Sequence, residues 1–153
     1  MITMKAKYAI KALARLAVAT PGEPILIADI AEQEEIPKKF LEAILAELKQ
    51  HGFVRSRKGR GGGYLLAKTP EAITLASILR ALDGPIAPVP CLSRTAYRRC
   101  DGCKDEATCS VRTVLRSAYA ASVEVLEQTT LADVAHNSEE LNKRSAVALR
   151  YSI

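Results

Sequence analysis

A glycine-rich hairpin that directly follows an amphipathic helix is the feature that most limits the fold of this chain. Residues 37–52 (PKKFLEAILAELKQHG) carry apolar side chains at helical spacing and end on glycine, a frequent helix terminator. Residues 53–68 (FVRSRKGRGGGYLLAK) hold two short apolar runs around a basic turn, which predicts a β-hairpin. Residues 28–36 (ADIAEQEEI) predict a shorter helix just before. Two short helices, a tight turn and a hairpin together predict a winged helix-turn-helix.

The rest of the chain predicts helices around this unit, over 4–19, 75–82 and 111–129, with a short helix capped by Thr130 and Asp133. We therefore expect a mainly α fold with a small β wing. The expected division is a winged helix-turn-helix domain at 1–84, a cysteine-rich loop at 85–110, a dimerisation helix and short following helix at 111–136, and a weakly ordered polar tail at 137–153.

Positive charge gathers in the first half of the chain. Residues 1–70 hold twelve Lys and Arg against seven acids, whereas residues 71–153 hold ten of each. A local basic surface favours a polyanion such as DNA, although a charge run can also be a merely solvated face. Helix position and wing charge predict these DNA contacts: Lys38, Lys39, Glu42, Arg57, Lys58, Arg60, Gly61, Gly62, Gly63 and Tyr64.

All four cysteines lie within one polar, basic loop: Cys91, Cys100, Cys103 and Cys109. Thiolates are soft ligands that suit iron–sulfur clusters and zinc, and the neighbouring arginines favour the thiolate form. An iron–sulfur cluster is the favoured interpretation. Zinc is weaker because only one C-x2-C pair is present, and metal-free redox thiols remain open.

The helix at 111–129 is too long to bury its apolar stripe on a small winged-helix domain alone. Ala118, Ala121 and Ser122 would permit another helix to approach closely. We expect a homodimer through this helix, which matches a two-fold DNA operator.

Several functional classes find no support. The start of the sequence, MITMKAKYAI, has lysines where a signal peptide has its apolar run, and no apolar stretch is long enough to span a bilayer. We therefore expect a cytoplasmic protein without a membrane partner. No arrangement of serine, histidine and acid indicates an enzyme. The two histidines, His51 and His136, are not favoured as ligands; His51 is expected at the end of the helix at 37–52.

Three stretches resemble the Rrf2 family of bacterial transcription regulators: residues 7–17 (KYAIKALARLA), residues 27–68 with the G-x-GGGY-x-L wing, and the cysteine loop. The resemblance covers residues 1–135. It implies a DNA-binding winged helix, a long dimerisation helix, and a cysteine loop carrying an iron–sulfur cluster, as in the IscR, NsrR and RirA types. By this resemblance Cys91 matches the first family cysteine, and Cys103 and Cys109 match its C-x5-C pair.

The resemblance also assigns Glu42 as the recognition-helix glutamate and Lys58 as the basic wing residue. The chain departs from the family in its longer cysteine loop with the additional Cys100. In the IscR type, a histidine three residues after the last cysteine completes the cluster. Arg112 stands there instead, and arginine is a poor ligand because it stays protonated. Cys100 is the first candidate for the fourth ligand, and a residue of the partner subunit is the second.

The leading hypothesis is a regulator whose affinity for double-stranded DNA is controlled by an iron–sulfur cluster, with 2Fe-2S favoured over 4Fe-4S. The signal would be iron, iron–sulfur status, nitric oxide or redox stress. One alternative is the same fold acting as a metal-free thiol–disulfide switch. Another is a metal-carrying iron–sulfur assembly protein that docks an acidic partner through its basic face.

Overall fold

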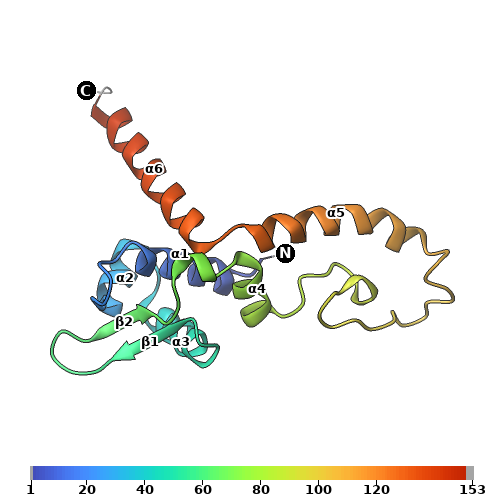
Figure 1. The fold of residues 1–153 in the computed structure, drawn as a ribbon, viewed down its shortest axis with the longest axis horizontal. Helices are drawn as coiled ribbons and strands as arrows, with labels where there is room; N and C mark the ends of the chain where they lie inside the picture. Colours follow the sequence, from blue (N-terminus) through green and yellow to red (C-terminus); the bar gives the residue numbers. More distant parts are fainter. Residues whose placement is uncertain (1, 151–153) are drawn as a thin grey trace.

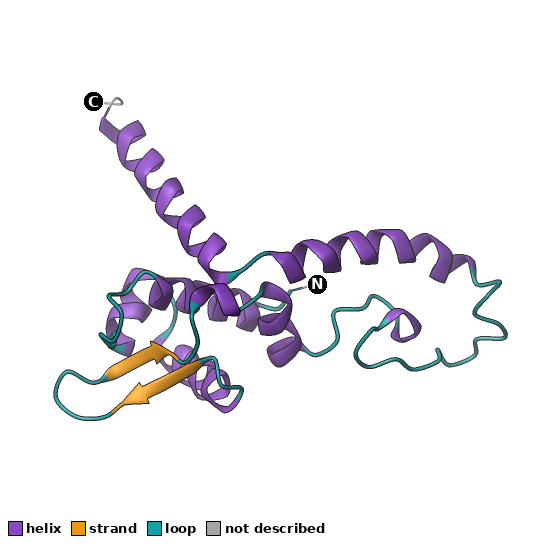
Figure 2. Cartoon of the chain, in the orientation of Figure 1, coloured by secondary structure: helices purple, strands orange, loops and turns teal. Residues whose placement is uncertain are grey.

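The computed structural model describes residues 2–150 of the chain, and the predicted mainly helical architecture with a two-stranded wing is confirmed (Figures 1 and 2). The elements in chain order are α1 (Met4–Ala17), α2 (Ile27–Gln33), α3 (Lys38–Gln50), β1 (Val54–Arg57), β2 (Gly63–Leu66), the 3-10 turn η1 (Pro70–Ala72), α4 (Leu75–Asp83), the 3-10 turn η2 (Pro90–Leu92), α5 (Ser110–Gln128) and α6 (Leu131–Arg150).

Local sequence explains where the helices of the winged domain start and stop. The Thr3 hydroxyl accepts a hydrogen bond from the Ala6 amide at 3.1 Å and caps α1. Helix α3 begins after Pro37 and ends at His51, and Gly52 follows with a φ of +73°, which glycine adopts without strain. The predicted position of His51 at the end of this helix is therefore confirmed.

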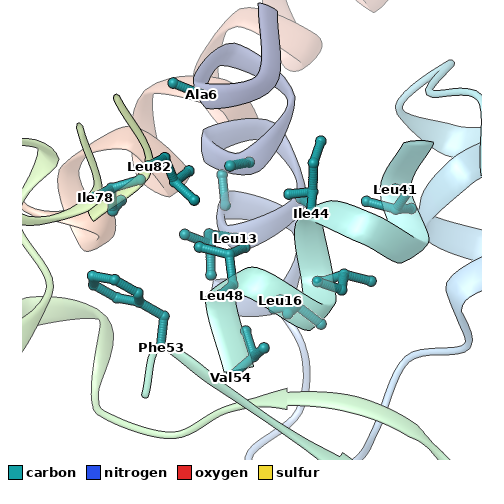
Figure 3. Close-up of a cluster of buried hydrophobic side chains, with 14 of the residues drawn as sticks. Ala6, Leu13, Leu16, Leu41, Ile44, Leu48, Phe53, Val54, Ile78 and Leu82 are labelled. Atoms are coloured by element: carbon teal, nitrogen blue, oxygen red, sulfur yellow. The ribbon is translucent and has the colours of Figure 1, made fainter. Parts of the chain in front are cut away.

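The core of the winged domain lies between α1, α3 and α4 (Figure 3). Helix α1 contributes alanines and leucines from one face, and small side chains there allow the neighbouring helices to pack closely. Leu13, Leu45, Leu48 and Ile78 are completely buried. This packing fixes the orientation of α3, whose opposite face is left exposed to solvent.

The wing is an antiparallel pair in which Val54 lies opposite Leu66 and Arg57 opposite Gly63. The segment before α2 forms a short bridge to β2. The Ile25 amide donates to the Tyr64 carbonyl at 3.0 Å, and the Tyr64 amide donates to the Ile25 carbonyl at 2.9 Å. The hairpin is therefore held at its base by a segment that precedes the helix-turn-helix.

Helix α5 projects away from the winged domain, and the loop between α4 and α5 extends alongside it (Figure 1). Two hydrogen bonds fix the C-terminal end of α5. The Leu75 amide donates to the Thr129 carbonyl at 3.0 Å, and the Leu131 amide donates to the Ile73 carbonyl at 2.7 Å. The end of α5 thus joins the segment that leads into α4.

Helix α6 differs in length from the sequence prediction. The predicted cap is present, since Thr130 Oγ1 accepts from the Asp133 amide at 3.2 Å and Asp133 Oδ2 accepts from the Thr130 amide at 2.8 Å. Residues 137–150 were expected as a polar tail, but they continue the helix. No glycine or proline follows Gly102 to end the helix, and the first half of α6 packs across α1. The remaining predicted tail residues, 151–153, lie outside the described part of the chain. Within residues 2–150, no helix has the length and apolar character needed to cross a bilayer.

Candidate functional site

The first candidate surface combines the exposed face of α3 with the turn of the wing. Lys38 and Lys39 are exposed on the first turn of α3 and Glu42 is exposed one turn along, while the opposite face of the helix is buried in the core. No side chain caps this helix start, so its first amides and the two lysines favour an anion nearby. The exposed face continues along the helix with the small residues Ala43 and Ala46, which leave room for a surface to approach.

The wing turn carries its positive charges outward. Arg57, Lys58 and Arg60 are exposed, and the Arg57 guanidinium also donates to the Gly22 carbonyl at 3.4 Å. Lys49 of α3 donates to Ser56 of β1 at 2.7 Å and links helix to wing. The predicted basic residues therefore lie on two adjoining elements that are fixed relative to one another.

The glycines of the wing do not all serve the same purpose. A Cβ at Gly62 would lie 2.4 Å from the Arg57 carbonyl oxygen, and one at Gly63 would lie 2.3 Å from the Ile25 carbonyl oxygen. Gly61 has open space around it and a φ of +74°. Gly62 is thus required by the turn of the hairpin and Gly63 by the contact of the wing with Ile25, while close approach of DNA to Gly61, Gly62 and Gly63 stays a prediction. Tyr64 is half-buried and packs against the core, and its predicted contact with DNA stays a prediction.

The second candidate site is a cavity of about 250 Å³ beside the start of α5. All four cysteines are free thiols and all four line it. Cys91 is buried in η2, and the Cys103 amide donates to the Cys100 carbonyl at 3.2 Å in a tight turn. Cys109 is the N-cap of α5, where its sulfur accepts from the Arg112 amide at 3.4 Å. The loop therefore brings together the four residues that the sequence singled out.

One arginine and one glutamate shape the electrostatics of this cavity. Burial raises the pKa of the Cys91 thiol, and the neighbouring Cys100 raises that pKa further, whereas the Arg112 guanidinium lowers it. Tyr97 donates to Glu106 Oε1 at 2.7 Å, which raises the pKa of the tyrosine. Arg112 Nη2 lies 3.7 Å from Glu106 Oε2. A positive charge is thus held beside the sulfurs.

The cavity suits an iron–sulfur cluster by its chemistry. Thiolates are the ordinary ligands of such clusters, and the Nε of Arg112 is a buried donor without an acceptor among the described residues. Within residues 2–150, no three Cys, His, Asp or Glu side chains gather closely enough to hold a single metal ion. The four thiols line one cavity but are too far apart to ligate a metal ion as they stand. Binding of a cluster would therefore require the loop to draw them closer.

Helix α5 exposes an apolar stripe on the face away from its own domain. Of its apolar side chains only Val123 is fully buried, while Val111, Val114 and Val125 are more than half exposed. Together with Ala118 and the neighbouring Ala121, these side chains recur at alternating steps of three and four residues. That spacing is the seam of a pair of packed helices.

The family is decided by the sequence comparison. The profile of the Rrf2 family, described as iron-dependent transcriptional regulators, matches residues 2–137. This chain belongs to the Rrf2 family. An rrf2-like HTH-type transcriptional regulator of Rhodobacter capsulatus is 45% identical over 137 residues, covering 88% of this chain and 91% of the relative. The HTH-type regulator IscR of Erwinia tasmaniensis is 30% identical over 140 residues, covering 92% and 81% of the two chains.

Solved structures agree with this assignment of the fold. CymR, the global cysteine regulator of B. subtilis, has a TM-score of 0.75 and 31% identity and covers 90% of this chain and 97% of its own. IscR of T. potens has a TM-score of 0.71 and 27% identity, with coverages of 92% and 90%. The predicted winged-helix fold and the predicted role in transcription regulation are thereby confirmed for this Rrf2 protein.

A junction that the sequence did not reveal joins the three parts of this Rrf2 regulator. Glu127, near the end of α5, accepts from Arg80 of α4 at 2.6 Å, which lowers the pKa of the glutamate. Its other oxygen lies 3.6 Å from Arg94 of the cysteine loop. The separations of 47 and 33 positions along the chain carry no local signal in the sequence. The carboxylate of Glu127 therefore links α5 to the winged domain and to the cysteine loop.

Proposed function

We propose that this Rrf2 protein is a homodimeric regulator whose affinity for its DNA operator is controlled by an iron–sulfur cluster bound by Cys91, Cys100, Cys103 and Cys109. The observation that carries the proposal is the cavity that all four thiols line, in the loop between the winged domain and α5. When bound, the cluster supplies a centre that responds to iron supply, oxidants or nitric oxide. We further propose that 2Fe-2S is its form and that the protein acts in the cytoplasm.

The exposed stripe of α5 supports the homodimer. A valine-rich stripe facing solvent along a helix of 19 residues needs a cover, and a second copy of the same helix matches its regular spacing. Two-fold pairing would place two α3 helices and two wings for an operator with two half-sites. Lys38, Lys39 and Glu42 would then face the major groove, with Lys58 and Arg60 against the phosphates.

The Glu127 junction supports a route from the loop to the DNA surface. Ordering of the loop would change the position of Arg94, which shares a carboxylate with Arg80 of α4. Helix α4 packs against α1 and α3, so a shift at this junction reaches the orientation of the recognition helix. A tenfold change in operator affinity needs only about 1.4 kcal/mol of difference between the two states of the loop.

The test of the sensor begins with protein purified without oxygen. We expect visible absorbance with stoichiometric iron and sulfide, and we expect Cys103→Ala to lose it. Cys103→Ser is the smaller change that separates loss of the ligand from loss of packing. A colourless protein that instead binds one zinc ion per chain would contradict the proposal.

The test of regulation compares loaded and cluster-free protein on the same DNA, a fragment selected from genomic DNA by the purified protein. We expect at least a tenfold difference in affinity. Lys58→Ala should weaken binding of the competent form and lower the salt dependence by about one counterion. Lys68→Ala is the matched control, because Lys68 lies over the Phe53 ring, away from the wing turn. Identical affinity of both forms would refute cluster control.

A second candidate function, a thiol–disulfide switch, is favoured by the position of one thiol pair. Cys91 and Cys100 line the same cavity, and Cys100 raises the pKa of the Cys91 thiol. A peroxide could accept two electrons and two protons from this thiol pair, leaving a disulfide and water or alcohol. One structural neighbour, Staphylococcus aureus CymR, was solved in an oxidized form. Mass analysis of oxidised, metal-free protein, with DNA affinity measured before and after reduction, distinguishes this switch from the cluster.

A further inference from the structure

Arg112 lines the cysteine cavity and has a buried donor atom without a hydrogen-bond acceptor among the described residues. Its side chain is 22% exposed, it lines the cavity together with Cys91, and its backbone amide donates to the Cys109 sulfur. The Nε atom is buried and has no acceptor within the described residues. Leaving a buried donor of a charged group unsatisfied is costly, so this atom needs an acceptor that the side chains around it do not provide.

The guanidinium is held in place from its other side. Glu106 Oε2 lies 3.7 Å from Arg112 Nη2, and Glu106 Oε1 accepts from the Tyr97 hydroxyl at 2.7 Å. Both side chains of the Arg112–Glu106 pair are largely shielded from solvent. Tyr97 and Glu106 therefore hold one Nη atom of Arg112, and the arginine itself lines the cavity in which the four cysteines lie.

The chemistry of this arrangement follows from charge. Four thiolates around an iron–sulfur core make an anionic group, and hydrogen bonds to its sulfurs stabilise the more negative, reduced state most. A protonated guanidinium cannot ligate iron, but it can donate to several sulfur acceptors at once. Its place in the first turn of α5 fixes it beside Cys109, in the wall of the cavity that Cys91 also lines.

We propose that Arg112 is a positioning residue of the cluster site: its guanidinium donates hydrogen bonds to the sulfurs, while Cys100 completes an all-cysteine ligand set and Glu106 with Tyr97 orients the arginine. This inference rests on the proposed function, since it requires a bound cluster. Arg112 is thus the cationic hydrogen-bond donor that sets the reduction potential of the bound cluster.

The first test measures the midpoint potential of the cluster in anaerobically loaded full-length protein, titrated with a one-electron reductant. Arg112→Gln should lower the equilibrium constant for reduction at least tenfold, which for a one-electron couple is about 59 mV. Arg112→Lys keeps the charge but loses the planar guanidinium, so its midpoint potential should lie between those of wild type and Arg112→Gln. Arg116→Gln, one turn along α5 and outside the cysteine cavity, is the matched control and should leave the potential unchanged.

The second test uses pulsed EPR of the reduced cluster in protein labelled with ¹⁵N-arginine. We expect a weak arginine nitrogen coupling that is present in wild type and Arg116→Gln and absent in Arg112→Gln, without the strong coupling of a coordinated nitrogen. An unchanged potential in Arg112→Gln, or a strong coupling from a nitrogen ligand, would overturn the assignment. A wild-type protein that takes up no cluster would instead refute the proposed function itself, before any variant is compared.

Discussion

Replacement of Gly63 by alanine should destabilise the protein far more than the same change two residues earlier. The Cβ of Gly63→Ala would meet the Ile25 carbonyl oxygen at 2.3 Å and its carbon at 2.6 Å, both backbone atoms that cannot rotate away. The residue also has a φ of +147°, a conformation reserved largely for glycine. The clash can be relieved only by moving the wing away from the segment before α2.

The size of the effect follows from what that movement breaks. Two hydrogen bonds join Ile25 to Tyr64, at 3.0 and 2.9 Å, and each contributes about 1 kcal/mol net. Backbone strain adds about 1–3 kcal/mol, which gives a total loss of roughly 3–5 kcal/mol. For a chain of this size the melting temperature should fall by roughly 10 °C, because each kcal/mol corresponds to about 2–4 °C.

Gly61→Ala is the control for this prediction. Its φ of +74° is unfavourable for alanine, but nothing lies within 4 Å of the added carbon, so the loss should be about 1–2 kcal/mol. Calorimetry at one fixed protein concentration compares the two variants, since the melting temperature of an oligomer depends on concentration. Equal losses at the two positions would show that the contact with Ile25 does not anchor the wing.

Further predictions concern α5, its junction and α6. Val114→Asp should convert the proposed dimer to a monomer in analytical ultracentrifugation, because Val114 is 74% exposed on the apolar stripe, whereas Thr113→Asp, on another face, should not. Glu127→Gln should reduce the difference in operator affinity between loaded and cluster-free protein while cluster content stays unchanged; an undiminished difference would exclude the junction as the route. Hydrogen bonds from Thr130 hold the pKa of Asp133 below its ordinary 3.8, so wild type should melt above Asp133→Asn at neutral pH. That advantage should persist down to about pH 4 and shrink as the pH falls through the depressed pKa; an advantage independent of pH would contradict this origin.

Much of the fold could be predicted because its signals are local. The apolar stripe and final glycine at 37–52 marked α3 with errors of one or two residues, and the Thr130–Asp133 pair marked the start of α6. The end of α6 was missed because polar composition suggested a tail. Composition does not end a helix, however, and its first half gains a surface on α1 that only the tertiary structure provides.

The candidate site was predictable in its thiols and not in its surroundings. Cysteines at close spacing must share a loop, so their common cavity followed from the sequence. The contact of Glu106 with Tyr97 and Arg112 lies in irregular structure, where no periodicity indicates which side chains meet. The contact of Gly62 with the Arg57 carbonyl was likewise not predictable, because a glycine run gives no sign of which carbonyl lies against it.

The sulfur of Cys109 belongs to two structures, since it lines the cavity and also accepts the Arg112 amide that closes the first turn of α5. Ligation, oxidation or alkylation at this atom changes its strength as an acceptor for that amide. Fraying at the beginning of α5 is therefore tied to the chemical state of a single sulfur. The rate of hydrogen–deuterium exchange at the Arg112 amide should therefore report whether the Cys109 sulfur is free, ligated or modified, in the presence or absence of DNA.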